Sequence, residues 1–295
     1  MAQDERIGPV TPWRWLQQAF ALLRAQPRVI IGATSLLLAV ALAPSVLQVA
    51  LTGASPWLAQ LLALVVSLLV YPPAVAGYYR VLHGVAQGVQ LQPSSLFAVF
   101  NDGACVRRMI IANLVFISGA VLVLMFLIWI FGGEELMAFF QQLATLQPGT
   151  TQLPAMPRGA LPLVVAAMLF GAALVSAQGI AYAELALGPR PPLAAIGAAI
   201  RLVARHFGLL LLFYVPAAVM GFLAFMMVAL VAVLLGTVLA MLSPALAPAL
   251  VLALSLVLAM LMYALLFSFF YCAWRDLLGD ALPPSTPGPA HQIEV

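Results

Sequence analysis

Long stretches without a charged residue dominate the chain, and their lengths predict how often it crosses a membrane. Charged residues are absent from 29–79, 109–133 and 159–183, and within 206–274 only one histidine can ionise. Crossing the hydrocarbon core of a bilayer takes roughly 20 helical residues. The two shorter stretches therefore hold one transmembrane helix each. The two longer stretches hold a pair each, which gives six helices.

Turn-forming residues divide the two longer stretches. Thr52-Gly53-Ala54-Ser55-Pro56 interrupts the first, and Ser243-Pro244 with Pro248 interrupts the last. Within the second helix, Tyr71-Pro72-Pro73 predicts a local break, because proline lacks a backbone N–H donor. The proline-rich end, 281–295, predicts a disordered cytoplasmic tail after a single transmembrane domain over 1–280. We expect the six transmembrane helices near 29–51, 57–79, 109–131, 160–186, 208–236 and 249–271.

The composition supports the same fold class. Hydrophobic residues make up 65% of the 295 residues and charged residues only 7%, whereas soluble domains carry about 25% charged residues. A chain this apolar cannot cover its own surface in water. The sequence therefore predicts an all-α, polytopic six-helix transmembrane bundle.

The arginines predict the orientation of this bundle. All twelve basic residues are arginine, and eleven of them fall on one side of the predicted helices, with only Arg158 on the other. Because basic residues concentrate on the cytoplasmic side, both termini are expected in the cytoplasm. The tryptophans fit interfacial belts at both boundaries: Trp13, Trp15 and Trp274 at the cytoplasmic one, and Trp57 and Trp129 at the outer one.

Amphipathic segments precede the first, third and fifth predicted helices. The first begins at Thr11-Pro12, with Trp13, Leu16, Phe20 and Leu23 on one face, and is expected to lie in the membrane surface. Similar segments begin at Pro93 and at Pro191-Pro192. The chain can thus be interpreted as three parallel repeats of surface helix, basic residues and helical hairpin. The alternative is three unrelated hairpins with ordinary amphipathic connectors.

One long outer segment, 132–159, interrupts this pattern. It predicts a helix on the outer surface with an apolar face that docks a periplasmic partner or caps a cavity; the alternative is a helix that only covers lipid. The candidate outer interaction surface consists of Leu136, Phe139, Phe140 and Leu143.

Glu184 is the only acidic residue inside a predicted transmembrane helix, which makes it a candidate functional group. Tyr182 and Gln178 add polar atoms nearby on the same helix. One hypothesis is a proton- or cation-linked site in which Glu184 pairs with Arg80, Arg201 or Arg205. The alternative is an interfacial carboxylate that locks a surface helix through a salt bridge.

Short motifs at both ends of the chain resemble a family of uncharacterised proteobacterial six-helix inner-membrane proteins. The motifs are Trp13-x-Trp15-Leu16 with Phe20, Arg24 and Pro27, the segment Phe97-Ala98-Val99-Phe100, and Tyr271-Cys272-Ala273-Trp274-Arg275-Asp276 with Gly279. The chain also looks distantly like the membrane domain of glycerophosphodiester phosphodiesterases, without their catalytic domain. The resemblance implies a bacterial inner-membrane location and six spans, and it brings no activity or functional residues.

Motifs for catalysis and for cofactor or metal binding are absent from the sequence. The basic residues lie at helix ends and form no nucleic-acid patch. We therefore expect no enzyme, cofactor, metal or nucleic-acid partner. The leading hypothesis is a non-enzymatic accessory or scaffold factor that binds membrane lipids or another membrane or periplasmic protein through its surface helices. The alternative is a small transporter or lipid-handling protein with a cavity near Glu184.

Overall fold

A computed structural model describes residues 11–51, 53, 55–144, 157–242 and 246–279. These residues form helices and contain no β-strand, which confirms the predicted all-α class. The predicted tail at 281–295 and residues 145–156 of the long outer segment lie outside the described ranges. The elements are α1 (Thr11–Ala25), α2 (Pro27–Leu51), α3 (Pro56–Val65), η2 (Val66–Val70), α4 (Tyr71–Ala86), η3 (Pro93–Asn101), α5 (Gly103–Phe131), α6 (Gly133–Ala144), α7 (Ala160–Leu187), α8 (Pro192–Leu242) and α9 (Leu246–Leu277).

Within this part of the chain, six helical segments are long and apolar enough to cross a membrane. This finding confirms a multi-pass membrane protein built on a six-helix bundle. The segments are Pro27–Leu51, Pro56–Ala86, Gly103–Phe131, Ala160–Leu187, Pro192–Leu212 and Pro248–Leu277.

The second membrane-length segment is built from three pieces. A π-helical turn, η2, joins α3 to α4, and Pro72 and Pro73 occupy the first turn of α4. Proline has no N–H for the hydrogen-bond ladder, and the wider π turn accommodates that interruption without ending the helix. The predicted break at Tyr71-Pro72-Pro73 is therefore a local change of helix type.

Helix α8 combines the amphipathic segment expected from Pro191 onward with the fifth predicted span. It has a kink at His206, where φ is −113° and ψ is 19°, between the two predicted parts. Its 51 residues would span about 77 Å if straight, far more than the bilayer core of about 30 Å. The apolar segment identified in α8 starts at Pro192, earlier than the predicted residue 208, because the helix continues through the kink.

The six long helices pair into three hairpins. The first comprises α2 and α3–η2–α4, the second α5 and α7, and the third α8 and α9. Helices α4, α7 and α9 contact one another, and α2, α5 and α8 each pack on their own partner and on the second helix of the neighbouring hairpin. The surface elements follow the same cyclic order, since α1 packs on α9, η3 on α4 and α8 on α7. This arrangement is the one expected of three parallel repeats.

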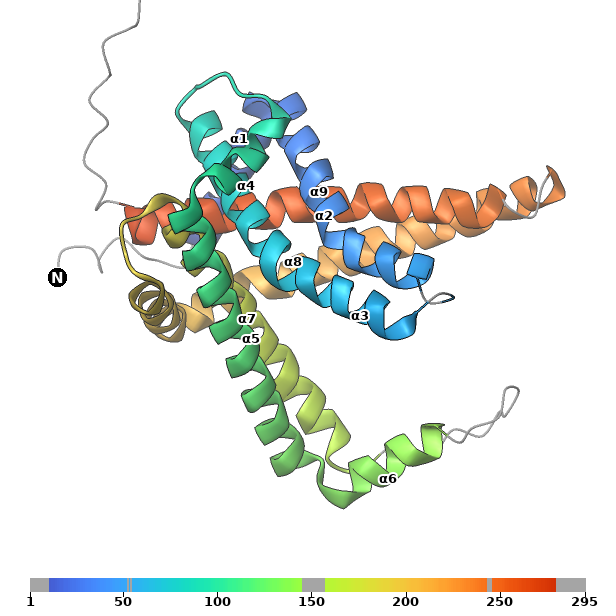
Figure 1. Ribbon diagram of the computed structural model, residues 1–295. Helices are drawn as coiled ribbons and strands as arrows, with labels where there is room; N and C mark the ends of the chain where they lie inside the picture. The colour runs from blue at the N-terminus through green and yellow to red at the C-terminus, as the bar shows by residue number, and fades with distance from the viewer. Residues whose placement is uncertain (1–10, 52, 54, 145–156, 243–245, 280–295) are drawn as a thin grey trace, which may run out of the picture.

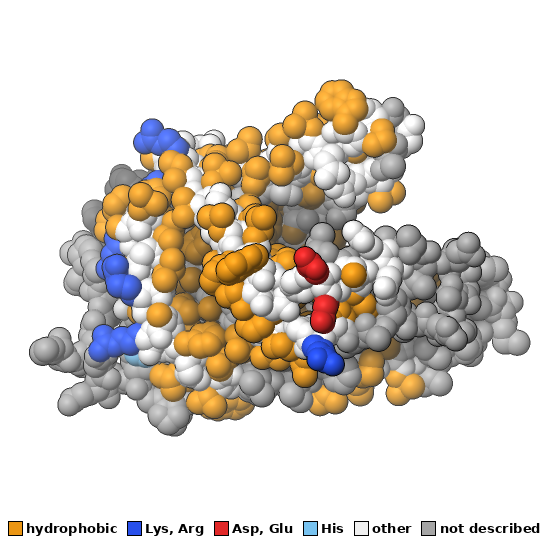
Figure 2. Space-filling view, turned by 90° about the horizontal axis from the view of Figure 1, so that it is seen from below, with side chains coloured by type: hydrophobic (Ala, Val, Ile, Leu, Met, Phe, Trp, Pro, Cys, Tyr) orange, Lys and Arg blue, Asp and Glu red, His pale blue; other side chains and the backbone are white. Residues whose placement is uncertain are grey.

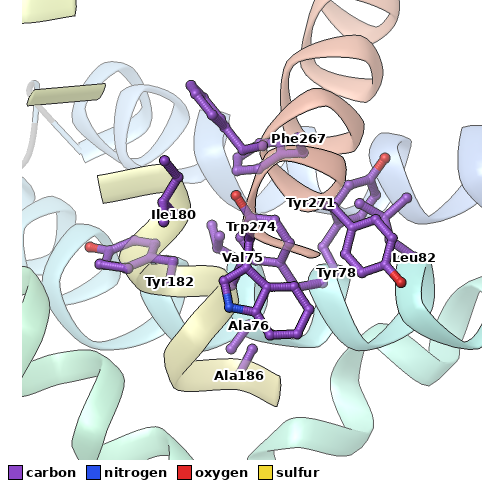
Figure 3. Close-up of a cluster of buried hydrophobic side chains, with 14 of the residues drawn as sticks. Val75, Ala76, Tyr78, Leu82, Ile180, Tyr182, Ala186, Phe267, Tyr271 and Trp274 are labelled. Carbon is purple, nitrogen blue, oxygen red and sulfur yellow. The ribbon is translucent and has the colours of Figure 1, made fainter. Parts of the chain in front are cut away.

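The core lies where α4, α7 and α9 meet. Aromatic rings from different helices touch edge to face there, with the centroids of Tyr78 and Phe267 5.5 Å apart. Small residues let the helices approach closely: a Cβ on Gly77 would collide with the backbone oxygen of Leu96 in η3. Figure 3 shows this cluster, with Val75, Ala76, Tyr78, Leu82, Ile180, Tyr182, Ala186, Phe267, Tyr271 and Trp274 labelled.

The hairpins diverge as they leave this core. In Figure 1, α5 and α7 run downward, whereas α8 and α9 run to the right. Helix α3 packs on α2 and η2 of its own hairpin. We call the end with α1, η3 and the start of α8 the basic end, and the opposite ends of the three hairpins the hairpin tips. The packed core therefore lies toward the basic end.

Candidate functional site

The second helix of each hairpin ends at the basic end with the same pattern, a charged residue four positions before a glycine. Each of these charged side chains makes polar contacts with another segment at this end. Together they form a polar layer across the base of the three hairpins. The pairs are Arg80 and Gly84 in α4, Glu184 and Gly188 at the end of α7, and Arg275 and Gly279 at the end of α9.

Glu184 is sealed inside this layer, with a side chain that is 3% exposed. Its Oε2 accepts a hydrogen bond of 2.8 Å from Nε1 of Trp274 in α9 and lies 3.3 Å from Nη1 of Arg190, in the loop before α8. A Cβ at Gly188 would collide with Oε1 of Glu184, so the glycine gives the carboxylate its space. Glu184 thus ties three segments together, as expected for a structural carboxylate that locks a surface helix.

The predicted ion-pair partners of Glu184 were wrong. Arg80 bonds Asp102 instead, and Arg201 and Arg205 are exposed on α8. Arg190, which sequence reasoning passed over, is the nearest cation because the short loop after Gly188 brings it back over the end of α7. The candidate residues therefore do not converge on one site.

In the polar layer, Arg80 connects the first hairpin to the second. Its Nη2 donates to Oδ2 of Asp102 at 2.6 Å, and its Nε donates to the carbonyl of Ala186 in α7 at 3.3 Å. Asp102 also caps α5, since its Oδ1 accepts from the N–H of Cys105 at 3.0 Å. The bond from Arg80 and then that N–H hold the pKa of the Asp102 carboxyl below its usual value. One ion pair thus joins α4, α5 and α7.

Arg275 and its neighbour Asp276 form the contact of the third hairpin. Arg275 donates to Oε1 of Gln18 in α1 at 3.1 Å. Oδ2 of Asp276 accepts from Nε1 of Trp15 at 2.9 Å and from Arg14 at 3.2 Å, both in α1. The first surface helix is therefore fastened to the last transmembrane helix, from the far end of the chain.

Tyr182 and Gln178 belong to a different contact, on the side of α7 that faces α5. Gln178 donates to the hydroxyl of Tyr182 at 2.9 Å, and that hydroxyl donates to Oδ1 of Asn113 at 2.8 Å. Such hydrogen bonds between helices stabilise their packing inside a membrane. The two residues hold α7 to α5 and do not join Glu184 in a common site.

A second group of arginines has no ion-pair or hydrogen-bond partner among the described residues. Each member is exposed at the basic end, and each of the three repeats contributes at least one. On the face seen in Figure 2, most of the basic side chains lie along the left edge, and hydrophobic side chains cover much of the described surface between them and the acidic pair. This unpaired group consists of Arg24 and Arg28 around the α1–α2 turn, Arg107 in α5 and Arg201 in α8.

Only part of the predicted outer interaction surface is exposed among the described side chains. Leu136 is buried and packs over Gly132, so the prediction that it contacts a partner is wrong. Phe139 is half-buried. The side chains of Phe140 and Leu143 lie outside the described part, although α6 runs through both positions. Helix α6 turns away from the end of α5 at Gly132 and Gly133 (Figure 1), the latter with a φ of +48° that favours glycine.

Sequence reasoning missed the partners that complete the polar layer: Arg190, Asp102, Asp276 and the indole N–H groups of Trp15 and Trp274. All three residues of the motif Trp274-Arg275-Asp276 make contacts across the fold, with Glu184, with Gln18 and with α1 respectively. Both indoles belong to the predicted cytoplasmic belt, but in the structure they are buried and donate to carboxylates. Among the described residues, no group of three His, Cys, Asp or Glu side chains is placed to hold a metal ion.

The fold defines the class of the chain as an α-helical multi-pass membrane protein. Comparison with models of known protein families, with curated proteins and with solved structures finds no match.

Proposed function

We propose that this protein is a non-catalytic membrane factor that binds a membrane lipid or a partner protein at its basic end, through α1, η3 and the start of α8. One observation carries the proposal. The charged groups at the base of the hairpins bond other parts of the protein, whereas the unpaired arginines lie exposed on or next to the surface elements. These elements also expose aromatic rings such as those of Trp13, Phe20 and Phe97. Guanidinium groups next to aromatic rings suit the polar–apolar boundary of a bilayer or of a membrane-bound partner.

The contacts of Glu184 favour this proposal over transport. A proton- or cation-linked carboxylate must reach solvent during its cycle, and that of Glu184 is enclosed by Trp274 and Arg190. We assign Glu184 to the assembly of the basic end. Glu184→Gln should therefore lower stability without abolishing binding of the lipid or partner.

We further propose that the protein resides in a bacterial inner membrane with the basic end and both termini in the cytoplasm. The support is the asymmetry of the arginines, eleven against one. A cysteine introduced at Arg24 should be labelled by a membrane-impermeant thiol reagent only after the membrane is opened. A cysteine at Arg158 should be labelled in intact spheroplasts, and the reverse pattern would overturn this orientation.

Extraction of the protein from its native membrane into polymer-bounded discs tests the binding function. Mass spectrometry of the discs should find one class of lipid enriched over the bulk membrane, or one protein present in a fixed ratio. Retention of neither would contradict the proposal. Flux of a small solute through liposomes containing the protein, lost in Glu184→Gln, would favour transport instead.

A further inference from the structure

The two faces of α1 differ in what they contact. Trp15 and Ala19 are buried against the third hairpin, and the ring of Trp15 meets that of Phe269 edge to face at 5.8 Å. The other face exposes Trp13 and Phe20, which are 60% and 43% accessible. Helix α1 is thus fastened to the protein on one side and open to its surroundings on the other.

A shallow groove runs along the open face of α1. Phe20 and Arg24 line it together with Gln17, Ala21 and Ala25. The groove therefore combines a guanidinium, an amide and an aromatic ring within about two and a half turns of one helix.

Arg28 extends this basic region across the turn between α1 and α2. Gln26 fixes the turn. Its side-chain Nε2 donates to the backbone carbonyl of Val89 at 3.0 Å, and its backbone carbonyl accepts from the N–H of Val29 at 3.2 Å. Neither Arg24 nor Arg28 has an ion-pair or hydrogen-bond partner in the described ranges. The two cations lie on a turn held to the rest of the basic end.

The position of the groove indicates what it meets. Helix α2, which crosses the membrane, begins at Pro27, directly between the two arginines. Arg24 and Arg28 therefore lie at the level of lipid headgroups. Phe20 is about one turn before Arg24, and Trp13 lies further along the same exposed face of α1. Guanidinium groups bind phosphate oxygens through paired hydrogen bonds, and aromatic rings prefer the headgroup boundary.

We propose that this groove binds the headgroup of an anionic phospholipid from the surrounding leaflet. Arg24 and Arg28 contact its phosphate, Gln17 bonds its polar headgroup, and Phe20 and Trp13 cover the start of its acyl chains. The inference rests on the proposed function, since it names the lipid and the surface that binds it. A basic residue near an anionic leaflet contributes roughly a fivefold gain in binding.

Titration of the purified full-length protein with phosphatidylglycerol or phosphatidylcholine, read by native mass spectrometry, tests the proposal. We expect wild type to retain phosphatidylglycerol at least about tenfold more tightly than phosphatidylcholine. The double variant Arg24→Gln with Arg28→Gln should lose that preference by about the same factor. Phe20→Ala should weaken both lipids by a few-fold, because it removes apolar contact rather than charge.

Arg158→Gln is the matched control. It removes the same charge from an exposed position near the start of α7, at the hairpin tips, and should leave the preference unchanged. All variants should keep the thermal unfolding midpoint of wild type, because the altered side chains are exposed.

The remaining outcomes separate this inference from the broader function. A preference for phosphatidylglycerol that Arg24→Gln with Arg28→Gln leaves intact overturns the groove assignment and keeps lipid binding. Displacement by an equal concentration of glycerol 3-phosphate identifies a soluble phosphate as the ligand and overturns the lipid assignment. A co-purifying acidic protein lost in the double variant also overturns it in favour of a partner protein. Binding of neither lipid, with no protein retained from native membranes, contradicts the proposed function itself.

Discussion

Helix α5 carries a methionine toward each end, and the two side chains have different environments. Near the basic end, Met109 is fully buried, whereas Met125, toward the hairpin tips, is 64% accessible. Both residues are methionines on one apolar helix, so hydrophobicity does not distinguish them. In a lipid solvent an apolar side chain gains little by leaving lipid for protein, and helices associate through close packing and hydrogen bonds. The basic end has the small residues and polar pairs that provide both.

The largest expected loss of stability comes from filling the space between α4 and η3 at the basic end. Gly77→Ala places a methyl group against the backbone oxygen of Leu96, so η3 must move away from α4. We expect a loss of about 3 kcal/mol or more in the free energy of unfolding, measured by SDS-driven unfolding in lipid–detergent micelles.

Gly119→Ala is the control for that variant, because nothing lies within 4 Å of the added methyl group in α5. Its stability should be unchanged or higher by up to about 1 kcal/mol, from helix propensity. Equal losses in both variants would contradict the difference in packing between the two regions.

The two methionines of α5 test directly whether the basic end is packed more tightly than the hairpin tips. Met109→Ala leaves a cavity in the core and should cost about 2–3 kcal/mol of unfolding free energy. Met125→Ala should cost less than about 0.5 kcal/mol, because lipid replaces the lost side-chain atoms. The same unfolding assay applies, and a substantial loss in Met125→Ala would mean that the hairpin tips pack against protein.

The bond between Trp274 and Glu184 tests whether the buried carboxylate is structural. Trp274→Phe keeps most of the ring and removes the N–H, leaving Oε2 of Glu184 with Arg190 alone. A lost hydrogen bond to a buried charge costs about 2 kcal/mol. Trp129→Phe, at an exposed ring near the hairpin tips, should cost less than about 0.5 kcal/mol in the same measurement.

The smallest expected loss of stability follows from breaking the ion pair between Arg80 and Asp102. Because the pKa of Asp102 is lower in the folded protein, its charge stabilises the fold above the unfolded pKa of about 3.8, and this stabilisation disappears as the pH falls through the folded value. Asp102→Asn keeps a helix-capping side chain and removes the charge.

The pair is partly exposed, with side-chain accessibilities of 35% and 39%, so the difference from wild type should be at most about 1 kcal/mol at neutral pH. Unfolding measured from pH 7 to pH 3 should show the two proteins converging below pH 4. A difference that stays constant with pH would assign the effect to packing rather than charge.

Local features of the chain determined the number of membrane helices, the hairpin pairing and the positions of the interruptions. Charge-free lengths, prolines and glycines act within one or two helical turns, which is why the changes at Pro72-Pro73 and before residue 208 were predictable. The repeated order of surface element and hairpin could also be predicted from the sequence, because each amphipathic segment begins at or next to a proline.

Only the tertiary structure decided which polar groups meet and where the helices separate. Glu184 bonds Trp274 from 90 residues away, and Arg14 bonds Asp276 from 262 residues away. Nothing local distinguishes these partners from Arg80 or Arg201, because the choice depends on the rotation of each helix and on its neighbours. Hydropathy also cannot predict where the hairpins diverge. A side chain that faces lipid and one that faces another helix are equally apolar.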